Sequence, residues 1–543
     1  MTIHPKDLKR LIVRVVAVTV ALRAVHLFSV DLNALEVAAA WALPAEGHAV
    51  APLHLLIAAW REVCGGVAGL LRAPTLIADA ALPLLAIAYA RASGWGTLSG
   101  LMAGLVLAVA PLGLDDGWRA DGSTLIAALA FAGLWQLRLG LRRGKVLAVA
   151  LSVLCWAAAL GLNPVALVVT PAALWLIARS VAMPQVKAVA AAGWLLSALA
   201  GWALGGGASL DLASAWIQDS ALNGGRVIWT GSVTDLFAVA RAWGPAGASG
   251  AVATLFDTAA APSWRLWLGD AVMIAAAVGL LIGRVQEDPS PAAAEQDSGW
   301  KSVGVTHNTA PRVLGERDWA PLLLPPLTTL AWAWWTPDVA GVADALAVAR
   351  PFVAVLIGLG LTALCLKPWG AEELASAKRA VPSLVALALL LFGFGAHHTW
   401  VGTQRPSRMA PGKVARFVAS YTADSGQVLC LGLGGLEIAW RLGPWPTLPR
   451  VSRTPSEPVS AQAALDESLR KRPKWLALAG DKWALESPSL GGALSASLSK
   501  RGYTLVEDGH RHLDRLGVLV LEFGGQEPAP SAVRPQLYPG KAP

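Results

Sequence analysis

Long apolar segments dominate the first 400 residues of the chain, and short polar stretches separate them. Windows of about 18 to 22 residues carry almost no charge, and a helix of that length crosses a hydrocarbon core of about 30 Å. We therefore predict an α-helical polytopic membrane module over residues 1–400. Its expected spans are 11–30, 69–91, 96–112, 122–139, 145–162, 164–182, 184–205, 266–284, 319–336, 342–366 and 381–400.

The pattern changes after residue 400. Short strand-like runs such as "GQVLCL", "PKWLALAGD", "YTLVED" and "GVLVLEF" alternate with helix-like runs such as "LGGALSASLSKRG". Alternating strand and helix signals indicate a small α/β domain, expected over residues 401–525. The tail 526–543 is expected to be disordered. The "GLGG" after the first strand lacks the rest of a GxGxxG dinucleotide fingerprint, so we do not expect a nucleotide site there.

Basic residues indicate the topology. Arg142, Arg143 and Lys145 lie in a tight turn between two spans, and the positive-inside rule places that turn in the cytoplasm. Counting spans from there puts the N-terminus inside and the C-terminal domain outside. The segments 31–68, 113–121 and 206–265 then become outer loops, and 285–318 becomes an inner linker. The expected location is a bacterial cytoplasmic (inner) membrane.

Composition supports the same class. Hydrophobic residues make up 55% of the 543 residues and charged residues only 15%, a balance that no soluble enzyme needs. The net charge of +8 is spread over short loops rather than gathered on one face, so membrane lipids are expected partners and nucleic acid is not. The four cysteines form no CxxC motif and are interpreted as small core residues, with a bridge between Cys64 and Cys430 left open.

The first outer loop holds the main candidate residues. Asp31 follows the first span directly, and Arg23 lies within that span, where an arginine is costly unless it is paired or hydrated. In the functional interpretation, Arg23 lines a polar cleft for an anionic lipid head group and Asp31 is the catalytic carboxylate at its mouth. In the alternative, Arg23 and Asp31 pair only with each other.

Histidines follow in the same loop. Residues 51–64 have the pattern of a short helix, with His54 on one stripe and apolar side chains on another. This helix is too short to span and suits the membrane interface. His48 and His54 are candidate substrate-binding residues if the helix forms the floor of an active site. The alternative is a plain interfacial helix.

A second cluster occupies "LGLDDGWRADGS", residues 112–123. Asp115 and Asp116 are adjacent carboxylates that suit a divalent metal ion or acid/base chemistry, and Arg119 suits an anion. The alternative is a solvated loop that caps the next helix. Arg350 lies several residues inside a later span and is a further candidate for the same cavity.

The order of these features resembles the GT-C glycosyltransferases, in the bacterial branch similar to protein O-mannosyltransferases and the lipid A aminoarabinose transferase. In that family an Asp-Glu pair opens the first outer loop, and a Pro-Pro-Leu motif leads a later helix. Here "DLNALEVAAAWAL" aligns with the first helix, and "APLHLLIAAW" matches through Pro52 and Leu53. The span "SVLCWAAALGLNPVAL" is also similar to a family span, and the order of features covers most of the chain.

The resemblance implies transfer of a sugar from a polyprenyl-phosphate donor to a lipid, glycan or protein acceptor on the outer face. Asp31 would be the general base, and Arg23, Arg119 and Arg350 would hold the lipid phosphate. One departure matters, because Leu32 replaces the usual Glu. The nearest acid, Glu36, is a further candidate catalytic residue, although it lies more than one helical turn from Asp31. Either Asp31 acts alone, or Asp115 and Asp116 supply a partner, or the chain is an inactive scaffold. A lipid transporter is a further alternative.

Overall fold

The computed structural model describes most of the chain, which divides into a helical unit and a unit built around a sheet. The helical unit comprises residues 1–27, 44–214 and 228–402, and the second unit comprises 28–43, 215–227 and 403–543. The linker 285–318 and the tail 526–543 lie outside the described residues. The described residues are 5–29, 34–41, 52–65, 67–116, 122–180, 182–205, 233–245, 263–282, 319–335, 339–366, 374–403, 410–422, 426–442, 473–513 and 516–524, with a few single positions such as Leu32 and Arg119.

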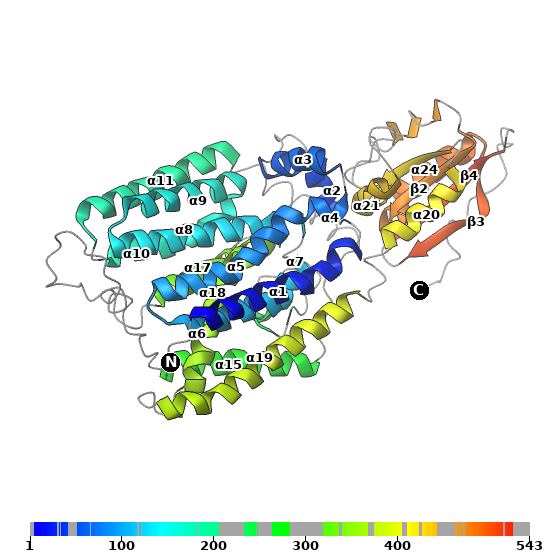
Figure 1. Ribbon diagram of the computed structural model, residues 1–543. Helices are drawn as coiled ribbons and strands as arrows, with labels where there is room; N and C mark the ends of the chain where they lie inside the picture. Colours follow the sequence, from blue (N-terminus) through cyan, green and yellow to red (C-terminus); the bar gives the residue numbers. More distant parts are fainter. Residues whose placement is uncertain are drawn as a thin grey trace. The chain divides into compact units, whose positions relative to one another are not determined.

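Each predicted span coincides with a helix of the helical unit, and one of them begins with a 3-10 turn (Figure 1). Five of these helices are long and apolar enough to cross a membrane by themselves. The unit is therefore that of a multi-pass membrane protein. Its long elements are α1 (Pro5–Ser29), α5 (Ala73–Ala92), α6 (Thr97–Val109), α8 (Ser123–Arg143), α9 (Val146–Leu162), η1 (Pro164–Val169) with α10 (Thr170–Arg179), α11 (Pro184–Gly205), α15 (Ser263–Ile282), α17 (Ala320–Trp335), α18 (Val339–Leu366) and α19 (Leu374–Thr403).

Four short helices complete the described part of this unit: α3 (Pro52–Cys64), α4 (Ala68–Leu71), α7 (Pro111–Asp116) and α13 (Val233–Ala242). Local chemistry sets several helix ends. Gly144 adopts φ +62° and ends α8, which lets α9 begin two residues later. Asn163 accepts a hydrogen bond from the Val165 amide at 2.9 Å and so starts η1.

Contacts between helices define which of their ends meet. Arg23, six residues before the end of α1, pairs with Asp79, six residues after the start of α5. Gly279 and Gly360 both lie near the C-terminal ends of their helices, and a Cβ at either would overlap the other helix's backbone, so α15 and α18 run in parallel. We call the end where α1 finishes and α5, α15 and α18 begin the Ser29 end.

The Ser29 end carries exposed aromatic side chains. Arg265 at the start of α15 lies 3.2 Å from the Nδ1 atom of His398, so α19 finishes at this end as well. Tryptophans are enriched where membrane helices meet the interface. The exposed tryptophans at the start of α15 and near the end of α19 are Trp264, Trp267 and Trp400.

The second unit contains a four-stranded mixed sheet of order β1-β2-β4-β3, formed by the four predicted strands. Strands β1 and β2 are parallel, and β4 is antiparallel to both β2 and β3. This confirms the predicted fold class of a helical membrane module with a small C-terminal α/β region. The strands are β1 (Gly426–Leu431), β2 (Trp475–Asp481), β3 (Tyr503–Leu513) and β4 (Leu516–Phe523), and the helices are α2 (Ala34–Ala40), α20 (Ala410–Thr422), α21 (Gly432–Leu442), α23 (Lys482–Glu486), η4 (Pro488–Gly492) and α24 (Ala493–Lys500).

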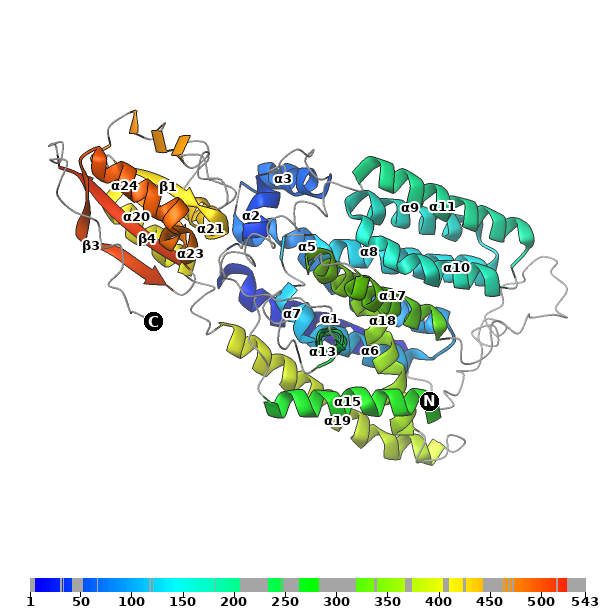
Figure 2. The ribbon, with the colours of Figure 1, turned by 180° about the vertical axis from the view of Figure 1, so that it is seen from behind.

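Alternate residues of the strands supply two apolar layers, because successive side chains of a strand point to opposite faces. Leu429 and Leu478 belong to a core with α24, whereas Cys430 and Ala479 belong to a core with α20 and α21. Helices thus cover both faces, as Figure 2 shows for α24 and α20. This is why the strands read as continuous apolar runs rather than alternating ones.

The "GLGG" motif has a structural role in this unit. It begins α21, and the Gly434 amide donates a hydrogen bond to the Asp481 carboxylate at 2.9 Å. A Cβ at Gly434 would lie 2.7 Å from Oδ1 of that carboxylate. The chain's own acid therefore occupies the helix N-terminus, where a nucleotide phosphate would otherwise bind. All four cysteines are free in the structure.

Candidate functional site

A buried cluster of three charged side chains joins three helices of the helical unit. Asp79 on α5 pairs with Arg23 of α1 through one carboxylate oxygen and with Arg350 of α18 through the other. The three residues are at most 2% exposed. One carboxylate thus faces two guanidinium groups, which leaves one excess positive charge among apolar helices. We call Arg23, Asp79 and Arg350 the charged triplet.

Backbone groups complete the coordination of Arg23. Its Nη1 donates to the carbonyl of Ala108 at 2.6 Å and of Thr19 at 3.3 Å, and its Nη2 donates to the carbonyl of Leu107 at 3.1 Å. The last carbonyls of a helix have no partner within the helix, and Leu107 and Ala108 lie in the last turn of α6. The C-terminus of α6 therefore stabilises the Arg23 cation.

The Arg350 guanidinium is less fully engaged. Its Nη2 atom bonds to Asp79, whereas its Nε and Nη1 atoms are buried without a hydrogen-bond partner among the described residues. A Cβ built at Gly113 of α7 would lie 2.6 Å from Nη1 of Arg350 and 2.8 Å from Nη2 of Arg23. Both guanidinium groups therefore converge on the α7 backbone at a position that has no side chain.

Two of the predicted polar loops also meet. Leu53 of α3 is buried, and a Cβ at Gly122, which has φ +87°, would overlap its side chain. The helix with the Pro-Leu motif thus packs against the turn that precedes α8 and follows Arg119. Because α7 belongs to that same connection, the loop next to the charged triplet and the loop of α3 are neighbours.

The structure brings together only some of the predicted site residues. Arg23 and Arg350 share Asp79, so the interpretation in which Arg23 pairs only with Asp31 is wrong. Asp31 and His48 lie outside the described residues. The backbone of Asp115 and Asp116 forms the last turn of α7, and their side chains are not described.

The remaining predicted residues lie in different places. Arg119 is buried in the connection after α7, and His54 is half-buried on α3. Glu36 is fully buried on α2, in the unit that contains the sheet. Across the part of the chain that the structure describes, no group of three or more His, Cys, Asp or Glu side chains is arranged to hold a metal ion. The divalent metal ion remains a prediction tied to Asp115 and Asp116.

Sequence reasoning missed Asp79. Its signal was available, because it is the single acid between Ala73 and Ala92 in an apolar segment, and such a residue costs several kcal/mol unless it is paired. The pairing itself was not visible, since the partners lie 56 and 271 positions away in the chain.

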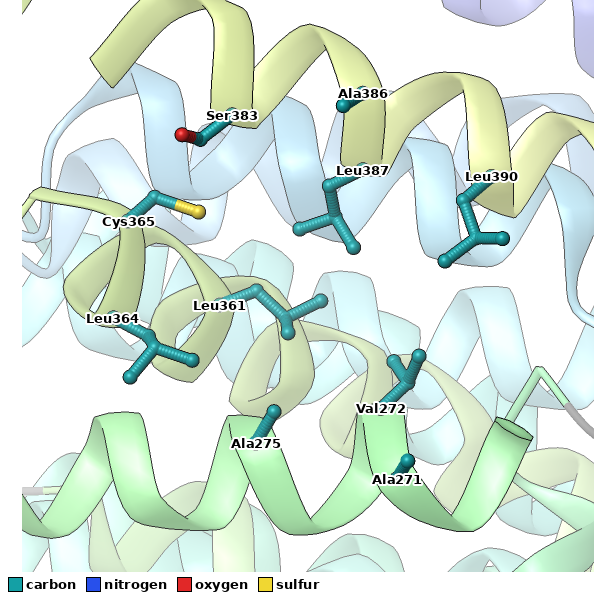
Figure 3. A pocket seen from close by; sticks show the side chains of 10 residues that line it. All are labelled: Ala271, Val272, Ala275, Leu361, Leu364, Cys365, Ser383, Ala386, Leu387 and Leu390. Atoms are coloured by element: carbon teal, nitrogen blue, oxygen red, sulfur yellow. The ribbon is translucent and has the colours of Figure 1, made fainter. Parts of the chain in front are cut away.

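An apolar hollow also lies in the helical unit. It has a volume of about 560 Å³ and lies between α15, α18 and α19. Figure 3 shows aliphatic side chains such as Leu361, Leu387 and Leu390 pointing toward it, with Cys365 and Ser383 as the polar members. Such a lining suits a hydrocarbon chain and offers no group for acid/base chemistry.

These features define a helical multi-pass membrane module with a C-terminal α/β unit. No family model and no curated protein matches the sequence. Among solved structures, the chain is similar to the archaeal oligosaccharyltransferase AglB from Archaeoglobus fulgidus in complex with an inhibitory peptide and a dolichol-phosphate. The identity is 12% and the TM-score 0.46, over 92% of this chain and 72% of that one.

Two further structures are similar. Mycobacterial arabinofuranosyltransferase AftD is 16% identical with a TM-score of 0.45, over 96% of this chain and 42% of that one, so the chain spans less than half of AftD. ArnT from Cupriavidus metallidurans bound to undecaprenyl phosphate is 14% identical with a TM-score of 0.37, over 94% of this chain and 97% of that one.

Proposed function

We propose that this chain transfers a sugar from a polyprenyl-phosphate-linked donor to an acceptor on the outer face of a bacterial inner membrane. The charged triplet is the observation that carries the proposal. Arg23 and Arg350 were selected from sequence as phosphate-binding residues, and they converge beside α7. Their joint charge exceeds that of Asp79 by one, so an anion entering this end would complete the neutralisation.

A purely structural role explains the triplet less well. Replacing a buried ion pair by well-packed apolar residues is often neutral or stabilising, so such pairs are weak stability devices. Two arginines within membrane-spanning helices are costlier still, and intramembrane charges usually mark functional sites. The unpartnered Nε and Nη1 atoms of Arg350 offer hydrogen bonds that a phosphate can accept.

The proposed chemistry is a displacement at the anomeric carbon. The acceptor hydroxyl oxygen forms a bond to that carbon, and the bond from the carbon to the phosphate oxygen breaks. The hydroxyl proton passes to the Asp31 carboxylate, and the polyprenyl phosphate leaves as an anion held by Arg23 and Arg350. Asp31 suits this role because it follows Arg23 by eight residues and comes two residues after α1 ends.

The other candidates have secondary roles in this proposal. Arg119 would bind the donor head group, and Asp115 and Asp116 would contact the sugar, directly or through a metal ion. His48 and His54 would bind substrate from the α3 loop. Under the predicted topology the Ser29 end faces the outside, and its exposed tryptophans suit a membrane interface on either side.

The first test measures binding of polyprenyl phosphate to the full chain in nanodiscs. Arg350→Lys keeps a positive charge beside Asp79 but loses the planar fork of donors, so we expect about tenfold weaker binding with the fold preserved. Arg241→Lys is the matched control, because Arg241 also binds a carboxylate with two nitrogens, Asp270 at 2.6 and 2.9 Å, outside the triplet. Equal affinities in both variants would overturn the proposed phosphate site.

The second test addresses catalysis. Membranes with the full chain are supplied with polyprenyl-phosphate-linked pentoses and hexoses, and release of polyprenyl phosphate is measured. Asp31→Asn should bind polyprenyl phosphate normally and lose about 10² to 10⁴ in rate, as expected when a general base is removed. Near-normal release by this variant would sink the role of Asp31. Binding without release by the native chain would favour the scaffold or transporter.

A further inference from the structure

The apolar hollow between α15, α18 and α19 is a feature of the helical unit that the proposed function leaves unused. It has a volume of about 560 Å³, and aliphatic side chains form almost all of its lining. Its polar members, Cys365 and Ser383, are uncharged, so a charged group would be desolvated there without an ion-pair partner. The chemistry of the lining therefore selects a hydrocarbon chain.

The hollow borders the apolar outer surface of these helices. The apolar stretch of α18 is 89% buried, whereas those of α15 and α19 are 28% and 33% buried. Leu390 lines the hollow and is itself exposed, and the α19 residues Val385 and Leu389 are exposed as well. In a multi-pass membrane protein such apolar surface lies in the hydrocarbon region, where it avoids water. Hydrocarbon chains of the bilayer therefore lie next to the hollow.

The hollow extends along the helices. Figure 3 shows its α19 side chains spaced from Ser383 to Leu390, and seven residues of a helix extend about 10 Å. Cys365 comes one residue before the end of α18, so the hollow lies toward the helix ends opposite the Ser29 end. An acyl chain parallel to the bilayer normal, with its head group in the leaflet at that opposite side, matches this direction and depth.

Helix α19 is fixed to its neighbours near the Ser29 end. His398 lies 3.2 Å from Arg265 of α15, and a Cβ at Gly395 would lie 2.8 Å from the Cβ of Val109 on α6. Between residues 383 and 390, by contrast, the hollow separates α19 from α15 and α18. An unfilled space of this kind forfeits dispersion contacts, which a hydrocarbon chain would restore. A bound chain would therefore stabilise this half of α19.

We propose that the hollow binds an acyl chain of a bilayer phospholipid, which fills the space between α15, α18 and α19. Phospholipid is the occupant because it surrounds every exposed apolar surface of a membrane protein and needs no path from another site. The polyprenyl donor is the competing occupant, and its phosphate is assigned to Arg350, which precedes Leu361 on α18 by eleven residues, or about 17 Å. The inference is independent of the proposed function, since it requires neither sugar transfer nor the charged triplet.

The first test measures the affinity of the full chain for phospholipid. The chain is purified in mild detergent, phosphatidylglycerol is titrated, and bound lipid is counted by native mass spectrometry. Ala275→Phe places a ring in the hollow and should weaken phospholipid binding about tenfold. Ala277→Phe is the matched control, because Ala277 is exposed on the same helix and does not line the hollow. Equal affinities in the two variants would overturn the inference. Ala386→Phe fills the hollow from α19 and replaces Ala275→Phe if that variant does not fold.

Thiol modification gives a second readout on the native chain. Cys365 lines the hollow and is half-buried, and Cys155 on α9 is half-buried outside it. At phosphatidylglycerol concentrations about ten times Kd, N-ethylmaleimide should modify Cys365 about tenfold more slowly, because only the unoccupied fraction reacts, whereas Cys155 keeps its rate. Unchanged modification of Cys365 would overturn the inference. Protection by polyprenyl phosphate and not by phosphatidylglycerol would overturn it as well, and would assign the hollow to the tail of the donor.

Discussion

The two units differ in where their ion pairs lie. In the helical unit, Arg23, Asp79 and Arg350 are buried together at one end of apolar helices. In the second unit, ion pairs such as Arg501 with Asp466, at 2.6 Å, lie in solvent, with side chains 42% and 49% exposed. Aliphatic side chains fill the two layers between the sheet and the helices that cover its faces.

This contrast separates a core with single buried acids from one that keeps a cluster of opposite charges. The buried charged side chains described in the sheet unit are the acids Glu36, Glu437 and Asp481. At the Ser29 end of the helical unit two arginines share one carboxylate, and the desolvation of these three charges opposes folding. Such clusters concentrate at functional sites, which is why the triplet and not the sheet carries the proposed function.

The largest expected effect comes from removing the shared carboxylate. Asp79→Asn leaves Arg23 and Arg350 buried beside a neutral amide and should cost about 3–5 kcal/mol of unfolding free energy, the usual loss when a buried pair is broken. Asp466→Asn removes the exposed partner of Arg501 and should cost below about 1 kcal/mol. Both free energies are measured by denaturant titration of the full chain in detergent. Similar losses in the two variants would show that burial makes no difference to these pairs.

A smaller effect is expected from two glycines, one in each unit. Gly113→Ala places a methyl group against the guanidinium ends of Arg23 and Arg350, which must shift, so polyprenyl phosphate binding should weaken about tenfold. Gly434→Ala places a methyl group against Asp481 and Leu516, so it should cost about 1–3 kcal/mol of stability without changing that binding. Binding isotherms and unfolding titrations distinguish the two outcomes.

The control for these glycines is Gly161→Ala. A Cβ at Gly161 meets no atom within 4 Å, so this variant should match the native chain in both measurements. The comparison would be broken if Gly113→Ala lost stability but bound polyprenyl phosphate normally. In that case the space beside the triplet would serve packing alone.

The smallest expected effect is a pH dependence confined to the sheet unit. Burial lowers the pKa of His512, and the neighbouring charges of His510 and Lys482 lower it further, while Glu486 acts in the opposite sense. A depressed histidine pKa means that the unfolded chain binds more protons than the folded one. Stability should therefore fall as the pH drops below about 6.5, the ordinary histidine value.

His512→Gln tests this dependence. Between about pH 7 and pH 5, the thermal unfolding midpoint of the variant should fall less than that of the native chain, because the group that takes up the proton is gone. His397→Gln, at an exposed position of α19, is the matched control and should keep the native slope. An unchanged slope in His512→Gln would show that another group governs the acid response.

Much of the fold was predictable from the sequence because its signals are local. A run of about twenty apolar residues specifies a membrane helix without reference to the rest of the chain, and every predicted span coincides with a helix. The four strands were recognisable as short apolar runs for a similar reason. Their order β1-β2-β4-β3 was not, because strand pairing depends on contacts between distant segments.

The candidate site was predictable only in part. Arg23 and Arg350 stood out because an arginine within an apolar span is costly, and each could be selected without knowing its partner. Asp79 was missed because the adjacent acids of the loop at 115 and 116 gave a stronger pattern. Glu36 was read as an acid near Asp31, whereas its helix packs against α21.

By itself, the sequence determined the helices, the strands and the positions of charged residues within the apolar spans, since all three follow from residue type and local periodicity. Only the tertiary structure decided that one carboxylate serves two arginines and that α2 belongs to the fold of the C-terminal unit. The physical reason is that a buried charge demands a partner without specifying which one. The choice among partners depends on how helices separated by hundreds of residues pack together.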